Sequence, residues 1–368
     1  MQRRFIGPGA IAGLPAAVRS LAHPGRYVLV VAGDRSFDAC GGADIVDALP
    51  GPVRVLRSSG DLPRIEELAR LYRACGDVEI GCVVAVGGGR VIDLAKLLAC
   101  ALAAAGDPID PATGIDPRLE GRVPLIAVAT TAGSGSESTP FAVCYVAGRK
   151  TSLDRGFLLP DVAIVDPALL ASLPPQTMAC AGLDALCQSI EALLSRHAAP
   201  ASDTRAARAL VLVARSLRAA PRGDPRARAR LARGASEAGR AIALTRTTIP
   251  HALSYPLSVR HGIAHGHAVA LSMARYLERF GEALAADAAL APWRRSYARV
   301  LAALGARDPH QAASIWRSLL DDLGLAPTAS ACGLHRSDIA RLVEEYDPDR
   351  FANAPLSLEA NEIPGLFE

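Results

Sequence analysis

Short, wholly apolar runs alternate with amphipathic stretches along the first half of the chain. Tyr27–Ala32 and Cys82–Val86 are two such runs, and glycine follows each of them at once. Apolar runs of this length, bounded by turn residues, are typical of buried strands, and their alternation with helical periodicity indicates a parallel sheet. Three further runs fit the same pattern, namely Val53–Leu56, Leu125–Ala129 and Val162–Val165. We therefore predict an α/β domain with a doubly wound, Rossmann-like sheet.

The pattern changes after Asp166-Pro167, where strand-like runs give way to long stretches with apolar residues at helical spacing. These stretches are Met178–Ser195, Thr204–Ala219, Arg226–Ala243, Gly266–Phe280, Pro292–Leu304, His310–Leu323 and Arg336–Tyr346. We therefore expect the α/β domain to occupy residues 1–168 and an all-helical domain to occupy residues 169–368.

Composition narrows the class of protein. The net charge of +3 is spread without long runs of one sign, which gives no indication of nucleic-acid binding. No apolar stretch reaches the roughly 18 residues that a membrane span needs, and glycine and proline interrupt the N-terminal segment, unlike a signal peptide. The eight cysteines form no CxxC motif, as expected for reduced thiols in a cytoplasmic protein. Composition therefore gives no indication of a nucleic-acid or membrane partner.

Two glycine-rich segments, Gly87–Lys96 and Thr130–Glu137, each follow a predicted strand. A strand, glycine and helix in this order let backbone N–H groups approach an anion, and the helix N-terminus favours negative charge. Neither segment is a GxGxxG motif or a P-loop, and either one alone is equally well explained as a tight turn. Together they indicate a dinucleotide site.

Histidines are concentrated in one short region of the second half, at positions 251, 261, 265 and 267. A lone histidine there would most often be a packed core residue, and Asp184 alone would most often be a carboxylate at a helix start. Taken together, Asp184 and two of the imidazoles form a two-histidine, one-carboxylate set suited to Fe(II) or Zn(II) with an open position. Such an ion polarises a carbonyl oxygen and favours arrival of a hydride at its carbon.

Five ordered segments resemble the motifs of the iron-containing (group III) alcohol dehydrogenase family. They are Gly87–Lys96, Thr130–Glu137, Leu158–Pro167, Gly182–Leu186 and His251–Gly266. The resemblance implies an N-terminal nucleotide domain, a helical C-terminal domain, and an active site in the cleft between them. It also implies a homodimer or a larger homo-oligomer.

The resemblance implies that Asp184, His251 and His265 are metal ligands. The family's fourth ligand, a histidine, is replaced here by Gln188, whose neutral amide binds a divalent ion more weakly. The family's usual histidine four residues after His251, which is thought to assist proton transfer, is replaced by Tyr255. Tyr255 and His267 are therefore both candidates for moving the proton.

The resemblance also assigns coenzyme contacts in the first domain. The positions that match are Gly87, Gly88, Gly89, Asp93, Thr130, Thr131 and Ser134, with Lys150 matching a lysine that faces the coenzyme and the active site. Members that prefer NAD carry an aspartate directly after the first strand. Here that position is Gly33, which tolerates NADPH, whereas Asp34 argues for NADH if the register moves by one residue. We expect NADPH or NADH, with NADPH slightly favoured.

Within the family, Gln188 together with the segments around Tyr255 and His265 is most similar to the branch that reduces phosphonoacetaldehyde to 2-hydroxyethylphosphonate. Phosphonopyruvate is a close variant of that substrate. A phosphonate needs cationic partners, and the candidates are Arg155, Arg260, His261 and Lys150. With 38 arginines among the 40 basic residues, an arginine near any site also arises by chance.

Three other functions remain open on the sequence. The first is a general short-chain alcohol dehydrogenase or a maleylacetate reductase-like enzyme. The second is a cyclase of the dehydroquinate synthase type, which shares the fold and retains NAD. The third is a non-catalytic homologue whose metal site has been lost through Gln188.

Overall fold

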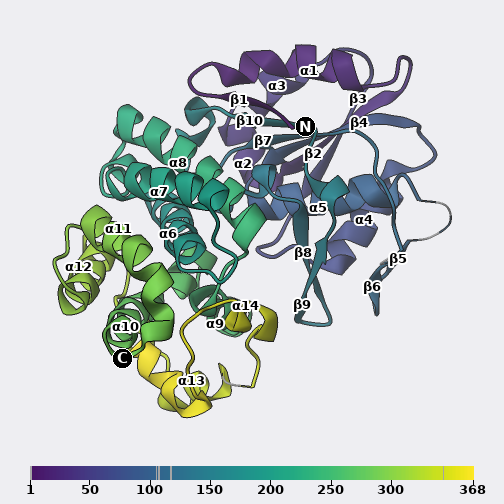
Figure 1. Cartoon of the computed structure of the whole chain (residues 1–368). Helices are drawn as coiled ribbons and strands as arrows, with labels where there is room; N and C mark the ends of the chain where they lie inside the picture. Colours follow the sequence, from purple (N-terminus) through teal and green to yellow (C-terminus); the bar gives the residue numbers. More distant parts are fainter. Residues whose placement is uncertain (1, 105, 107, 117, 343) are drawn as a thin grey trace. The chain divides into compact units, whose positions relative to one another are not determined.

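The computed structural model describes residues 2–104, 106, 108–116, 118–342 and 344–368, without the side chain of Arg35. The chain forms two compact units, Met1–Leu173 and Pro174–Glu368 (Figure 1). The boundary expected after residue 168 lies inside a short 3-10 helix, Pro167–Leu170, near the end of the first unit.

The first unit contains a six-stranded parallel sheet in the order β1-β10-β7-β4-β2-β3. Its strands are β1 (Arg3–Ile6), β2 (Tyr27–Gly33), β3 (Val53–Ser58), β4 (Ile80–Gly87), β7 (Leu125–Ala129) and β10 (Val162–Val165). The doubly wound class is thus confirmed. Strand β1 was not predicted, because it is an edge strand whose residues RRFI carry two charges.

Helices cover both faces of this sheet. They are α1 (Leu14–Leu21), α2 (Asp34–Ala39), α3 (Gly42–Asp47), α4 (Ile65–Cys75) and α5 (Gly89–Ala101). Helices α1 and α3 lie on one face, and α4 and α5 lie on the other (Figure 1). Two hairpins extend the unit, β5 (Ile109–Asp110) with β6 (Gly114–Ile115) and β8 (Phe141–Val146) with β9 (Arg149–Asp154).

The second unit is helical throughout its described part, which confirms the expected class. Its longer helices are α6 (Pro175–Leu193), α7 (Pro200–Ala214), α8 (Pro225–Thr245), α9 (Ile249–His261) and α10 (His265–Ala286). They are followed by α11 (Arg294–Leu304), α12 (Pro309–Asp322), α13 (Arg336–Leu342) and α14 (Pro348–Ala352). Helix α6 packs against α7, α8 and α10 and is buried along most of its length, so polar residues on it lie inside the unit. Among the described residues, no helix is both long and apolar enough to cross a membrane.

Candidate coenzyme and metal sites

The predicted coenzyme residues lie at the carboxyl ends of three neighbouring strands. Gly33 ends β2, Gly87 ends β4, and Thr130 follows β7, whose partner in the sheet is β4. Strand β2 pairs with both β3 and β4, so the chain reverses its direction across the sheet between β2 and β4. In open parallel sheets, ligands bind outside the carboxyl ends of the strands at such a switch point.

The two glycine-rich segments contact one another closely. A Cβ atom placed on Gly88 would lie 2.9 Å from Cγ2 of Thr131, and one placed on Gly89 would lie 2.4 Å from Oγ of Ser134. Only glycine therefore permits this approach. The contact places the N-terminus of α5, which begins at Gly89, beside the hydroxyls of the second segment. Backbone donors and a helix N-terminus gathered in this way suit the pyrophosphate of a dinucleotide.

The remaining predicted coenzyme residues surround this contact. Asp93 accepts hydrogen bonds from the Ser136 hydroxyl and, at 3.0 Å, from the Val143 backbone N–H, so it ties α5 to the strand β8. Burial raises the pKa of Asp93, and the charges of Lys96 and Lys150 oppose that rise. Lys150 lies on β9 opposite Tyr145.

Two further predicted coenzyme residues differ in their surroundings. The Oγ1 atom of Thr130 is buried and has no hydrogen-bond partner in the described chain, as expected of a group kept for a ligand. Asp34 is exposed at the start of α2.

The three predicted metal ligands lie together in the second unit. Asp184 comes from α6, His251 from the first turn of α9, and His265 is the first residue of α10. Their ligand atoms lie within 4.8 Å of one another. Nε2 of His251 lies 3.1 Å from Oδ1 of Asp184, and the two imidazole rings meet edge to face with centroids 5.4 Å apart. One carboxylate and two imidazoles converging at this distance fit a divalent transition metal with open positions.

Gln188 lies one turn after Asp184 on the same face of α6. Its Nε2 donates a hydrogen bond of 3.0 Å to Oδ1 of Asp184, the same oxygen that faces His251. The amide therefore lies beside the cluster, where its oxygen is a possible fourth ligand after rotation about the last side-chain bond.

Sequence reasoning missed Glu191, which is fully buried on α6 behind His251. Its Oε2 accepts a hydrogen bond from Nδ1 of His251, so the opposite ring nitrogen faces Asp184. Its Oε1 accepts from the backbone N–H of Thr248 at 2.9 Å and of His251 at 3.3 Å, and from the Thr248 hydroxyl at 3.1 Å. Glu191 thus caps the N-terminus of α9 and fixes the orientation of His251 at once. The spacing 184, 188, 191 on one helix face was the available signal.

The acidic surroundings set the charge of His251. Burial alone lowers its pKa, but the charge of Glu191 and hydrogen bonds to Asp184 and Glu191 outweigh burial and raise the pKa to about 9. Burial alone raises the pKa of Asp184, and its contact with His251 and the nearby charge of His265 bring it below its usual range. Asp184 is therefore a ready anionic ligand, and a metal competes with one proton on His251.

The two candidate proton donors lie in different places. Tyr255 is buried one turn after His251 on α9, and its ring stacks on His265 with centroids 5.7 Å apart and planes 7° apart. His267 lies two residues after His265, on another face of α10, where its Nε2 binds the carbonyl of Ala326 at 2.8 Å. The structure brings Tyr255 to the cluster but does not bring His267 there.

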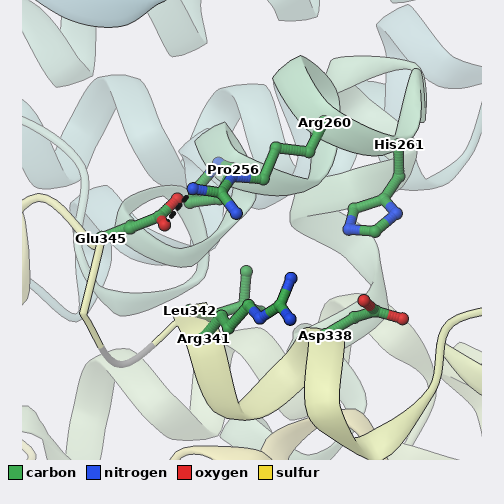
Figure 2. A pocket seen from close by; sticks show the side chains of 7 residues that line it. All are labelled: Pro256, Arg260, His261, Asp338, Arg341, Leu342 and Glu345. Carbon is green, nitrogen blue, oxygen red and sulfur yellow. Dashed lines mark hydrogen bonds and ion pairs between the residues drawn. The ribbon is translucent and has the colours of Figure 1, made fainter.

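The candidate anion-binding residues are dispersed. Arg155 is exposed in the first unit, where it precedes a 3-10 helix, Gly156–Leu158. Arg260 and His261 line a pocket of about 250 Å³ in the second unit together with Arg341, Asp338 and Glu345 (Figure 2). Figure 2 shows that the guanidinium of Arg260 already forms an ion pair with Glu345.

A second group of possible metal ligands occurs in the same unit, formed by Glu278, Glu282 and His310. Arginines already neutralise both carboxylates, since Arg275 pairs with Glu278 and Arg279 pairs with Glu282. Among the described residues Asp184 forms its ion pair with His251 and not with an arginine, which distinguishes its group from this ordinary ion-pair cluster.

Comparisons with known proteins show which family the chain matches. A sequence profile described as iron-containing alcohol dehydrogenase matches residues 2–167. A second, described as the C-terminal part of the Fe-containing alcohol dehydrogenase family, matches residues 178–363. The two profiles together cover most of both units.

Individual relatives point in the same direction. A phosphonoacetaldehyde reductase of Streptomyces viridochromogenes is 38% identical over 296 residues, which cover 76% of this chain and 74% of that protein. A long-chain-alcohol dehydrogenase of Geobacillus thermodenitrificans is 29% identical over 99% of this chain and 93% of its own length. The crystal structure of a sulfoacetaldehyde reductase from Bifidobacterium kashiwanohense in complex with NAD+ matches with a TM-score of 0.84 and 26% identity, covering 100% of this chain and 96% of that one.

Proposed function

The chain belongs to the iron-containing alcohol dehydrogenase family, and from this premise we propose that it reduces a small aldehyde that carries a phosphonate group. It is an NAD(P)-dependent oxidoreductase whose cofactors are a nicotinamide dinucleotide and a divalent metal, with iron the metal of the family. The proposed reaction converts phosphonoacetaldehyde to 2-hydroxyethylphosphonate, and phosphonopyruvate is a related possible substrate.

The observation that carries the proposal is the 38% identity to a phosphonoacetaldehyde reductase over three quarters of both chains. The sulfoacetaldehyde reductase supports the same class of substrate, because its substrate is also a two-carbon aldehyde with a tetrahedral anionic group. The joint presence of Gln188 and Tyr255 at positions where the family usually has histidine adds support from the sequence.

Each unit contributes residues of its own to this reaction. In the first, the backbone around Gly88 and Gly89 would bind the pyrophosphate of the coenzyme, and Lys150 would face it. In the second, Asp184, His251 and His265 would hold the metal, with Gln188 as a weak additional ligand. Lewis-acid polarisation of a carbonyl oxygen is the chemistry that a bound divalent ion supplies there.

Reduction also requires a proton at the carbonyl oxygen when the hydride reaches the carbon. We assign this proton to the hydroxyl of Tyr255, because its ring stacks directly on His265. A tyrosine hydroxyl carries a proton that it can donate as a general acid. The proton lost is then regained from solvent.

We propose NADPH as the preferred coenzyme. Gly33 ends β2 without a side chain, and a Cβ there would lie 2.3 Å from Oγ of Ser36, so a larger residue would require the Ser36 side chain to move. A 2′-phosphate therefore meets no carboxylate at this residue. A ratio of kcat/KM in favour of NADH would contradict this choice and point to Asp34.

The decisive experiment measures oxidation of NADPH with phosphonoacetaldehyde and with propanal, a neutral aldehyde of similar size. It is run with added Fe(II), with Zn(II), and with a chelator. We expect kcat/KM to favour the phosphonate at least about tenfold, since a charge-assisted hydrogen bond stabilises its complex by about 1.5–3 kcal/mol. Turnover should disappear with the chelator.

The outcomes separate the alternatives. Equal turnover of both aldehydes would favour a general alcohol dehydrogenase, as the long-chain relative suggests. NAD retained through purification, with no net consumption of NADPH, would favour a cyclase. Failure to bind any metal, with no turnover, would favour a non-catalytic homologue.

A further inference from the structure

An arginine of the C-terminal region, with a side chain that is 12% exposed, lies beside the candidate metal cluster, and neither the sequence motifs nor the comparisons assign it a role. Arg350 belongs to α14, and its guanidinium carbon lies 5.9 Å from the ring centroid of Tyr255. The ring of Tyr255 in turn stacks on His265 at 5.7 Å. Arg350 is therefore one side chain away from a candidate metal ligand.

The contacts of Arg350 fix the orientation of its guanidinium and leave the edge with Nη2 available to a ligand. Nη1 donates to the hydroxyl of Thr247, and Nε lies 3.3 Å from Oδ2 of Asp347. Nη2 donates no hydrogen bond to any described residue. Burial alone lowers the pKa of Arg350, but the acidic groups around it, Tyr255 first and then Asp347, outweigh burial and raise it. The guanidinium of Arg350 therefore stays charged. Its two terminal nitrogens, Nη1 and Nη2, lie in one plane and can both donate hydrogen bonds.

The segment that holds Thr247 has an unusual backbone. Arg246, directly before it, has φ 61° and ψ −179°, a conformation that favours glycine. The next two residues carry the hydroxyls that contact the site, Thr247 toward Arg350 and Thr248 toward Glu191. Strained backbone of this kind is concentrated at functional sites, where the surrounding structure holds it in place.

The other cationic region of this unit is less suited to an anion. Arg260 comes nine residues after His251, which places it about half a turn away, on the opposite side of α9. Its guanidinium is paired with Glu345, and Asp338 also lines its pocket (Figure 2). Tyr255, by contrast, shares the face of His251 and lies next to Arg350.

We propose that Arg350 and the hydroxyl of Thr247 form the binding site for the anionic group of the substrate. The fork of the guanidinium matches two oxygens of a tetrahedral anion, a phosphonate or a sulfonate, and Asp347 holds the fork in place. This inference rests on the proposed function and deepens it, because it names the residue that makes the enzyme prefer a charged aldehyde.

The test repeats the assay with phosphonoacetaldehyde and propanal on Arg350→Gln, Arg350→Lys and, as the matched control, Arg260→Gln. For Arg350→Gln we expect kcat/KM to fall about 100-fold with phosphonoacetaldehyde, mainly through a higher KM, and to change less than about twofold with propanal. Arg350→Lys keeps the charge but loses the fork, so its loss should be about tenfold. Arg260→Gln should behave as the wild type.

Equal losses with both aldehydes in Arg350→Gln would overturn the inference, since they would indicate only a structural link between α14 and α9. A loss specific to phosphonoacetaldehyde in Arg260→Gln would also overturn it and would place the anion in the pocket of Figure 2.

A second measurement separates this inference from the proposed function. Methylphosphonate and methanesulfonate are tested as inhibitors of propanal reduction in the wild type and in Arg350→Gln. Inhibition that Arg350→Gln abolishes supports the anion site even if the wild type shows no preference for phosphonoacetaldehyde, in which case only the proposed substrate fails. Absence of inhibition in the wild type, or equal inhibition in both proteins, rejects the site. A larger effect of methylphosphonate than of methanesulfonate would favour phosphonate as the natural group.

Discussion

The candidate coenzyme region of the first unit and the candidate metal region of the second are built in different ways. In the first, most of the candidate coenzyme contacts come from two short segments, residues 87–93 and 130–134. Because glycine lets these two segments touch, backbone groups provide many of the contacts. In the second, single side chains from α6, α9 and α10 converge, and their orientation depends on other buried side chains. A site formed by backbone groups tolerates most side-chain changes except at glycine. A site formed by single side chains from several helices loses binding when any one of those side chains is changed.

The largest expected effect is the loss of the carboxylate at the metal cluster. Asp184→Ala removes the proposed anionic ligand, so metal binding and turnover should both fall, with kcat reduced by about 10³-fold or more because several kcal/mol of charge stabilisation are lost. Metal content of the purified variant and its turnover with phosphonoacetaldehyde test this.

Glu282→Ala is the matched control, because Glu282 belongs to the second carboxylate and histidine cluster, which arginines neutralise. It should keep full metal content and activity. Unchanged turnover in Asp184→Ala would show that the reaction does not use the proposed metal site.

A smaller effect on metal binding is expected at Glu191, which contacts the candidate ligand His251 and is not itself a candidate ligand. Glu191→Gln keeps the size of the side chain but removes the charge that orients His251, so metal affinity should fall by about 10–100-fold. Competition with a chelator of known affinity measures this directly, without relying on activity. Glu237→Gln, a buried glutamate on α8 that pairs with Arg240, should leave the affinity unchanged. Equal affinities in wild type and Glu191→Gln would mean that His251 needs no fixed partner.

The difference between a region formed by short segments and one formed by distant side chains also explains what could be predicted from the sequence. Strand ends followed by glycine are local patterns, so the class of the first unit and the region around Gly88 followed from short windows. The candidate ligands His251 and His265 followed from a cluster of histidines and a family motif. Glu191 could have been predicted from its spacing, which places it on the same face of α6 as Asp184. Nothing else in the sequence shows that this glutamate is buried.

Arg350 could not be predicted from the sequence, because only the folded chain brings it beside Tyr255. Nothing in the sequence distinguishes it from the other 37 arginines. Strand β1 was missed for a related reason, because its residues RRFI match no apolar pattern and its partner β10 is distant in the sequence. The β8–β9 hairpin was missed as well. Its second strand, RKTSLD, is polar, whereas its first, FAVCYV, is an apolar run that we did not predict as a strand.

In the first unit, a substitution at Gly89 tests whether the backbone forms the candidate coenzyme site. In Gly89→Ala the new Cβ would lie 2.4 Å from Oγ and 2.8 Å from Cβ of Ser134, so the second segment must move. We expect coenzyme affinity to fall about tenfold, the loss of roughly one charge-assisted hydrogen bond, while metal affinity stays unchanged. Gly121→Ala, where the added Cβ meets nothing within 4 Å, should change neither. Equal coenzyme affinity in Gly89→Ala and wild type, measured by fluorescence titration, would contradict a backbone-built site.

His251 of the second unit and Lys96 of the first are both buried cationic side chains, and they should respond to pH in opposite directions. His251 has a pKa raised from 6.5 to about 9, so in the metal-free protein its contribution to stability is complete below pH 6.5 and is lost as the pH rises through 9. Lys96 is fully buried and donates to the carbonyls of Thr139 and Phe141. Burial lowers its pKa from 10.5 to about 8, and the charge of Asp93 only partly opposes this shift.

The smallest expected effect follows from that shift in Lys96. Between pH 8 and 10.5 the unfolded chain holds a proton on Lys96 that the folded chain has released, so this residue makes stability rise with pH in that window. The slope is at most about 1.4 kcal/mol per pH unit. Lys96→Met removes it, whereas cysteines and tyrosines that titrate in the same range contribute equally to both proteins and cancel in the difference. Urea unfolding of wild type and variant from pH 8 to 10.5 should therefore give free energies that diverge in favour of the wild type as the pH rises. Parallel curves would show that Lys96 stays charged in the folded chain through this range, and that its contacts with the carbonyls and Asp93 outweigh its burial.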